Sequence, residues 1–243
     1  MKRFILLLIL VVSCTINAQT FETCAKYLES KENQKASDCL KPLAEQGDAE
    51  AQFNLGLMYR NGEGVRQDYE KAIEWFQKAA ELGHAKAQYN LGLMYDNGDG
   101  VQQDYEKAIE WFQKAAELGH AKAQYNLGTM YYYGNDVKQD KQKAFEWFQK
   151  AAELGDPGAQ FYLGVMYKDG EGVRQDTHKA FELYQKVTKQ EYAKAQYNLG
   201  SMYYNGKGVR QDYQKAKEYF GKACNNGLQL GCDKYKELKE KGY

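Results

Sequence analysis

The sequence lacks an excess of either charge. Its 243 residues carry 33 basic and 33 acidic side chains, and loss of the first 18 residues would leave 31 against 33. Nucleic-acid binding needs a clustered basic face, and a membrane-surface anchor needs a polybasic segment. We therefore expect no nucleic-acid partner.

Serine and histidine are also scarce. No serine begins a Ser-x-x-Lys motif and there is no Lys-Thr-Gly, so the serine β-lactamase machinery is missing. No histidine has a second His or Cys at metal-ligand spacing, so we expect no metal and place these residues in solvated loops between helices. We expect no catalytic residues and no cofactor. The residues concerned are Ser30, Ser37, Ser201, His84, His120 and His178.

No apolar run is long enough to cross a membrane. The longest, residues 4–12, spans nine residues, whereas a transmembrane helix takes roughly 20. Because Lys2 and Arg3 precede it, the run is typical of an export signal. Cleavage after Ala18 would remove a signal peptide of residues 1–18 and release a periplasmic or secreted protein. The alternative is a lipobox ending in Cys14, which would leave a lipidated envelope protein.

Four cysteines follow on either route. They allow three pairings, but Cys24 and Cys39 lie near one end of the chain, and Cys224 and Cys232 near the other. Local pairing, Cys24–Cys39 and Cys224–Cys232, is therefore favoured in an oxidising compartment. The alternative is four reduced, buried thiols.

The chain repeats itself with a period of 36 residues. The segment at 49–59 returns at 85–95, 121–131, 157–167 and 193–203. Such a period is typical of stacked supersecondary units rather than of one closed globular core. We expect five units, at 48–84, 85–120, 121–156, 157–192 and 193–228.

Each unit predicts two helices. In the second unit Leu91 and Met94 share one helical face, and the glycines of residues 97–100 end that helix. Asp104 is placed to cap a second helix over about Tyr105–Leu118. The Gly-x-Gly turns follow helices rather than strands, so they do not predict a dinucleotide-binding loop. The predicted fold class is all-α, a right-handed α–α superhelix (solenoid) of helix-turn-helix repeats.

Three consecutive motifs carry a family resemblance. Ala-x-Ala-Gln-x-x-Leu-Gly-x-Met-Tyr, Gly-x-Gly-Val-x-x-Asp-x-x-Lys-Ala and Trp-Phe-x-Lys-Ala-Ala-Glu-x-Gly together resemble the Sel-1-like repeat, a relative of the tetratricopeptide repeat. The spacing of Cys224 and Cys232 resembles that of the cysteine-rich secreted Sel-1-like proteins of bacterial pathogens. This resemblance implies helix-to-helix staples and a non-catalytic role in protein interaction. The alternative is a β-lactamase-like or peptidoglycan-directed hydrolase, as suggested for the cysteine-rich relatives.

The repeats depart from the pattern at a few places. Residues 135–136 replace the second loop glycine of the third unit, and the fourth unit has Tyr184 at an aromatic position and Val187–Thr188 for an alanine pair. At the ends, residues 19–47 predict an N-terminal capping helix pair and residues 229–243 a C-terminal capping helix. Disulfides in these terminal segments would oppose fraying.

The first helix of each unit is the candidate binding element. By analogy with tetratricopeptide arrays it lines the concave surface, where the position after Met-Tyr changes from unit to unit. Aromatic side chains with polar tips suit recognition of a protein or peptide ligand, and we expect a monomer. The alternative is that the aromatic row packs between helices and the varied row is merely solvated. The candidates are Arg60, Tyr89, Asp96, Tyr125, Thr129, Tyr132, Tyr133, Tyr162, Lys168 and Tyr204, with Ser201 in a second varied row.

Overall fold

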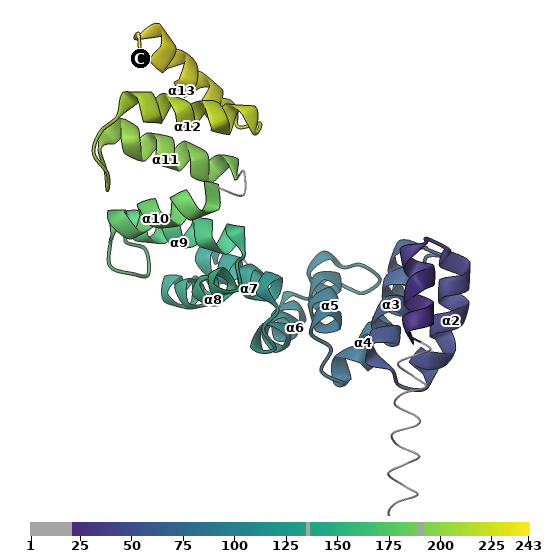
Figure 1. Ribbon diagram of the computed structural model, residues 1–243. Coiled ribbons are helices and arrows are strands. Elements are labelled where there is room, and N and C mark those ends of the chain that lie inside the picture. Colours follow the sequence, from purple (N-terminus) through teal and green to yellow (C-terminus); the bar gives the residue numbers. More distant parts are fainter. Residues whose placement is uncertain (1–20, 135–136, 189–191) are drawn as a thin grey trace, which may run out of the picture. The chain divides into compact units, whose positions relative to one another are not determined.

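The computed structural model describes residues 21–134, 137–188 and 192–243 (Figure 1). The predicted signal peptide and Cys14 lie outside these residues. Within them every regular element is an α-helix and there is no strand, which confirms the predicted all-α class. No helix in the described part of the chain has the length and apolar character needed to cross a membrane.

The helices follow one another in pairs. Residues 21–29 are helical and precede α2. The helices are α2 (Asn33–Glu45), α3 (Ala49–Asn61), α4 (Tyr69–Glu81), α5 (Ala85–Asn97), α6 (Tyr105–Glu117), α7 (Ala121–Tyr133), α8 (Lys141–Glu153), α9 (Pro157–Asp169), α10 (Thr177–Thr188), α11 (Ala193–Asn205), α12 (Tyr213–Asn225) and α13 (Gln229–Glu240).

Helices pack in chain order within two compact units, one ending at His120 and the other beginning at Ala121. In the first unit α2 packs on α3, α3 on α4 and so on to α6. In the second, each helix from α7 to α13 likewise packs on the next. Sequential packing of tandem helix pairs is the arrangement of an α-solenoid, as the period predicts.

Helix starts and stops follow the repeat. Asp104 begins α6 and accepts a hydrogen bond from the Lys107 backbone N–H at 3.0 Å, which confirms the predicted cap. Asp68, Asp140 and Asp212 do the same at α4, α8 and α12. First helices end at glycines with φ between +65° and +76°, a left-handed conformation that other residues adopt at a cost: Gly62, Gly98, Gly170 and Gly206.

A glycine in each first helix lies directly against an aromatic ring of the second helix. A Cβ atom on Gly92 would lie 2.5 Å from the Phe112 ring, and Phe112 is almost completely buried. The same contact recurs in every repeat, with Tyr184 in place of phenylalanine in the fourth. The pairs are Gly56–Phe76, Gly92–Phe112, Gly128–Phe148, Gly164–Tyr184 and Gly200–Phe220. Only a residue without a side chain permits this approach.

Buried glutamines join consecutive helices at three junctions. Gln88 Nε2 donates to the Ala80 carbonyl oxygen at 3.1 Å, eight residues back, and Gln52 and Gln160 make the equivalent bonds to Ala44 and Ala152. Each bond joins the end of one helix pair to the first helix of the next pair. It therefore fixes the junction between them.

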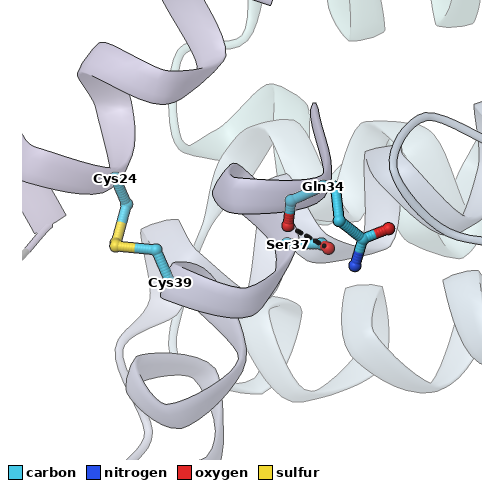
Figure 2. Close-up of a disulfide and its surroundings, with 4 residues drawn as sticks. All are labelled: Cys24, Gln34, Ser37 and Cys39. Atoms are coloured by element: carbon cyan, nitrogen blue, oxygen red, sulfur yellow. Dashed lines mark hydrogen bonds between the residues drawn. A yellow bond between two sulfur atoms is a disulfide. The ribbon is translucent and has the colours of Figure 1, made fainter. Parts of the chain in front are cut away.

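Disulfides join helices at both ends of the chain. Cys24 pairs with Cys39, which links residues 21–29 to α2 (Figure 2). Cys224 pairs with Cys232 between α12 and α13. Both are the local pairings predicted. Cys224 and Cys232 occupy the repeat positions of Ala80 and Gln88, so the last junction carries a covalent bond where three earlier ones carry a hydrogen bond.

Enlarging Gly92 tests the helix seam. We expect Gly92→Ala to lower the free energy of unfolding by about 1–3 kcal/mol, because the added methyl group meets the Phe112 ring. The matched control is Gly221→Ala, also within a helix, where the nearest atoms to an added Cβ lie 3.2 Å away. Urea denaturation should show the control unchanged or slightly stabilised, since alanine is the better helix former. Equal destabilisation by both changes would contradict the seam.

The last junction can be rebuilt from the others. Removing the disulfide as Cys224→Ala/Cys232→Ala should lower stability by about 2–3 kcal/mol. Cys224→Ala/Cys232→Gln restores the glutamine of earlier junctions and should recover about 1 kcal/mol, the typical net contribution of a hydrogen bond. Thermal unfolding of the three proteins measures the difference. Identical stability of the two variants would mean that the glutamine bond does not transfer to this junction.

Candidate binding surface

The first helices combine constant packing residues with varied surface residues. Their central leucine is buried in every repeat, at 55, 91, 127, 163 and 199. The position after the shared Met-Tyr is half-buried in every repeat, and its residue changes almost each time: Arg60, Asp96, Tyr132, Lys168 and Tyr204. The varied positions therefore lie at the surface of a constant scaffold.

In the first unit the candidates contact other residues of the chain. Arg60 Nη1 donates to Asn90 Oδ1 at 2.8 Å, which bridges α3 and α5. Tyr89 stacks on His120 with ring centroids 4.5 Å apart and also contacts Phe112. Asp96 is half-buried near the end of α5. The Arg60 guanidinium and the Tyr89 ring are thus used in contacts within the chain.

The expectation that the histidines lie in solvated loops is wrong for His84. Its side chain is only 14% exposed, and its Nδ1 accepts the Ala87 backbone N–H at 3.2 Å, which caps α5. The ring stacks on Phe53, and Nε2 lies 3.0 Å from Glu50. His84 stands where Asp48 and Asp156 begin other first helices, so its role is that of a helix cap. His178, by contrast, is exposed as expected.

In the second unit four candidate tyrosines gather into one cluster. Tyr125, Tyr132 and Tyr133 come from α7 and Tyr162 from α9. The Tyr133 and Tyr162 hydroxyls lie 2.9 Å apart, and Tyr162 also stacks on Phe148. Tyr133 is 52% exposed. Of the three consecutive tyrosines it is the most exposed, and the other two are half-buried.

A charged pair completes this tyrosine cluster. The Tyr132 hydroxyl donates to Glu171 at 2.6 Å, and the Lys141 ammonium lies 3.1 Å from the same carboxylate oxygen and over the Tyr132 ring. The hydrogen bond from Tyr132 lowers the pKa of Glu171, and Lys141 lowers it further. Burial, together with Glu171, raises the pKa of Tyr132. At neutral pH the cluster holds a carboxylate and a neutral phenol, with no activated nucleophile.

The remaining candidates are more dispersed. Thr129 donates to the Tyr125 carbonyl oxygen in its own helix. Tyr204 lies edge-on to Tyr213, and Lys168 forms an ion pair with Asp169 at 3.3 Å. The structure therefore brings Tyr125, Tyr132, Tyr133 and Tyr162 into one cluster, which does not include these three residues.

A pocket of about 420 Å³ lies between α9 and α11. Two residues of the varied rows, Lys168 and Ser201, line it together with residues that sequence reasoning missed, among them Thr177, Asn205 and Lys207. The missed residues come from helix ends and loops. The signal was present in the repeat itself, since residue 177 is a threonine where other units have tyrosine or lysine.

No set of three or more His, Cys, Asp or Glu side chains in the described ranges is arranged to hold a metal ion. Ser201 is the one serine in the pocket, and its hydroxyl donates to the Tyr197 carbonyl oxygen of its own helix. What the surface offers is aromatic rings, amides and paired charges, which are groups suited to recognition.

Fold and surface together define an α-solenoid repeat protein. A family model described as Sel1 repeat matches residues 49–84, 85–120, 121–156, 157–191 and 193–228. The chain belongs to the Sel1 repeat family, as the motifs predict. Sel1 repeats generally serve as scaffolds for protein interaction. A comparison with curated protein sequences gave no match.

This chain is similar to several proteins of known structure. A protective antigen of uropathogenic Escherichia coli with an SLR fold is 42% identical over 80% of this chain, with a TM-score of 0.78. This chain spans only 42% of that protein. A Sel1 repeat protein from Oxalobacter formigenes is 32% identical, with coverage of 87% and 84% and a TM-score of 0.80. Cysteine-rich protein B of Helicobacter pylori is 33% identical over 56% of this chain and 98% of that one, with a TM-score of 0.43.

Proposed function

We propose that this chain is an exported scaffold that binds a protein or peptide partner through the first helices of its repeats and catalyses no reaction. The observation that carries the proposal is the contrast within each first helix. The buried leucine and the glycine at the seam are the same in all five repeats, whereas the surface position after Met-Tyr is filled by four different residue types. A scaffold that only packed would have no need of this variety.

The chemistry of the varied positions supports a protein or peptide ligand. Tyr133 presents a phenol that is 52% exposed, and tyrosines are enriched in protein interfaces because they bury much area with few rotatable bonds. Lys168 and Tyr204 add a cation and a further aromatic ring. Together they provide the first helices of the second unit with both apolar and polar contacts.

Two disulfides support export, because such bonds persist in oxidising compartments. The N-terminal sequence supports the same proposal through either of its two processing routes. One relative being a protective antigen of a pathogen is in keeping with it. The intact mass of the mature protein distinguishes the routes, since a lipidated Cys14 adds acyl chains whereas cleavage after Ala18 removes that cysteine.

Affinity capture tests the binding role. The mature chain is immobilised and exposed to envelope extract and to host-cell secretome, beside a Tyr133→Ala/Tyr204→Ala variant. The control is Gln142→Ala/Gln185→Ala, which alters exposed positions on the second helices α8 and α10. We expect one partner that the wild-type and control chains retain and the tyrosine variant loses at least tenfold, with circular dichroism unchanged.

Two results would contradict this proposal. Equal capture by all three proteins would place the binding site outside the first helices. Turnover of a chromogenic β-lactam by the purified chain, abolished by one point substitution, would show that the chain is an enzyme.

A further inference from the structure

The pocket between α9 and α11 is open because its fillers are missing. At the preceding junction of the same unit, between α7 and α9, the equivalent space holds the Tyr162 ring and the Lys141–Glu171 ion pair. One repeat later these three positions are Asn198, Thr177 and Lys207. Three smaller or unpaired groups thus replace a ring and an ion pair, and a cavity of about 420 Å³ results.

The loop that carries Lys207 is held against the start of α10. A Cβ on Gly208 would lie 2.5 Å from the Thr177 carbonyl oxygen, just as one on Gly172 would lie 2.3 Å from that of Lys141. Because the backbone contact is the same, Lys207 occupies the place beside Thr177 that Glu171 occupies beside Lys141.

This position carries reversed charge. Among the other repeats it is acidic in three, as Glu63, Asp99 and Glu171, and asparagine in the third, and it is basic only at Lys207. Glu171 has Lys141 as its counter-ion, but Thr177 offers no charge to Lys207. In the described residues Lys207 takes part in no ion pair, whereas the other lysine of the pocket, Lys168, is paired with Asp169. The pocket lining therefore holds two lysines and one carboxylate, and Lys207, exposed at the rim, is the lysine that the carboxylate does not pair with.

A buried hydroxyl lies next to the same pocket. Tyr184 replaces the phenylalanine of the other repeats, is fully buried, and has no hydrogen-bond partner for its hydroxyl within the described chain. Burial raises the pKa of Tyr184, and the pocket-lining residues Asn198 and Asp169 also act on it, Asn198 lowering it. A buried hydroxyl without a partner is destabilising, so the structure gives it no stabilising role.

We propose that this pocket binds a carboxylate carried by the protein or peptide partner, with Lys207 as its counter-ion and the Asn198 amide as a hydrogen-bond donor. The inference rests on the proposed function and names the group that is recognised. In the bound state the Tyr184 hydroxyl, which has no partner within the described residues of the free chain, pairs with the Asn198 side-chain amide that acts on it, and Tyr184 thereby serves as a positioning residue. The carboxylate comes either from an Asp or Glu side chain or from a chain terminus.

Selection from random heptapeptides tests the pocket. The mature chain is used with one library that displays free C-termini and one that is fused at both ends. If side chains bind, we expect peptides enriched in Asp and Glu from both libraries. If the chain end binds, we expect binding peptides only from the library with free C-termini. Synthetic copies with Gln for Glu, or with an amidated terminus, should bind at least tenfold more weakly in fluorescence anisotropy.

Variants separate the pocket from general charge. Lys207→Glu restores the acid of the other repeats and should weaken binding of the selected peptides at least tenfold. Lys186→Glu makes the same charge change at an exposed position of α10 outside the pocket and should leave it within twofold. Tyr184→Phe restores the residue of the other repeats; we expect a higher melting temperature together with several-fold weaker binding, which a merely structural tyrosine would not give.

The proposal is overturned if no peptide is selected, if selection shows no preference for carboxylates, or if Lys207→Glu binds as the wild type does. In each of these cases the proposed function still stands if the wild-type chain captures a partner that the Tyr133→Ala/Tyr204→Ala variant loses. If no carboxylate peptide is selected and no captured partner is lost by the tyrosine variant, both proposals fail.

Discussion

The close approach of two helices at a glycine is the constraint on which the rest of this structure depends. In each repeat a first-helix glycine faces a buried ring at a distance that excludes a Cβ atom. This contact fixes how the two helices of a unit lie together. Because it fixes one face of the first helix, the opposite face is free to change in sequence without changing the fold.

Junctions between repeats use a second set of contacts. A buried glutamine reaches back eight residues to a carbonyl oxygen at three junctions, and a disulfide takes the same positions at the last. Terminal helices have one neighbour instead of two, so they lose packing that internal helices have. Covalent links at Cys24–Cys39 and Cys224–Cys232 are placed where that loss occurs.

The features that the sequence predicts correctly are mainly those that recur in every repeat. The period of 36 led to the helix pairs, the Asp104 cap and the solenoid, and the position of the cysteines along the chain led to their pairing. These features depend on residues within one unit or at its ends. The helix pairs and their caps recur in every repeat, so the sequence shows the same pattern several times.

Contacts between residues far apart along the chain are harder to predict from the sequence. Tyr132 and Glu171 are 39 residues apart, and their meeting depends on how one loop packs on the next unit. The burial of His84 is hard to predict for a related reason, because its ring stacks on Phe53, which lies far from it along the chain. The pocket between α9 and α11 is not predictable from one repeat, because it forms where Thr177 and Lys207 leave space between two repeats.

Amide hydrogen exchange with a captured partner tests the central claim, that the varied face of the first helices binds. Exchange is followed by mass spectrometry in the mature chain alone and in the complex. The account predicts slowed exchange in α9, α11 and the loops that follow them, with α8, α10 and α12 unchanged beyond their first turns. Slowing confined to the second helices would contradict it.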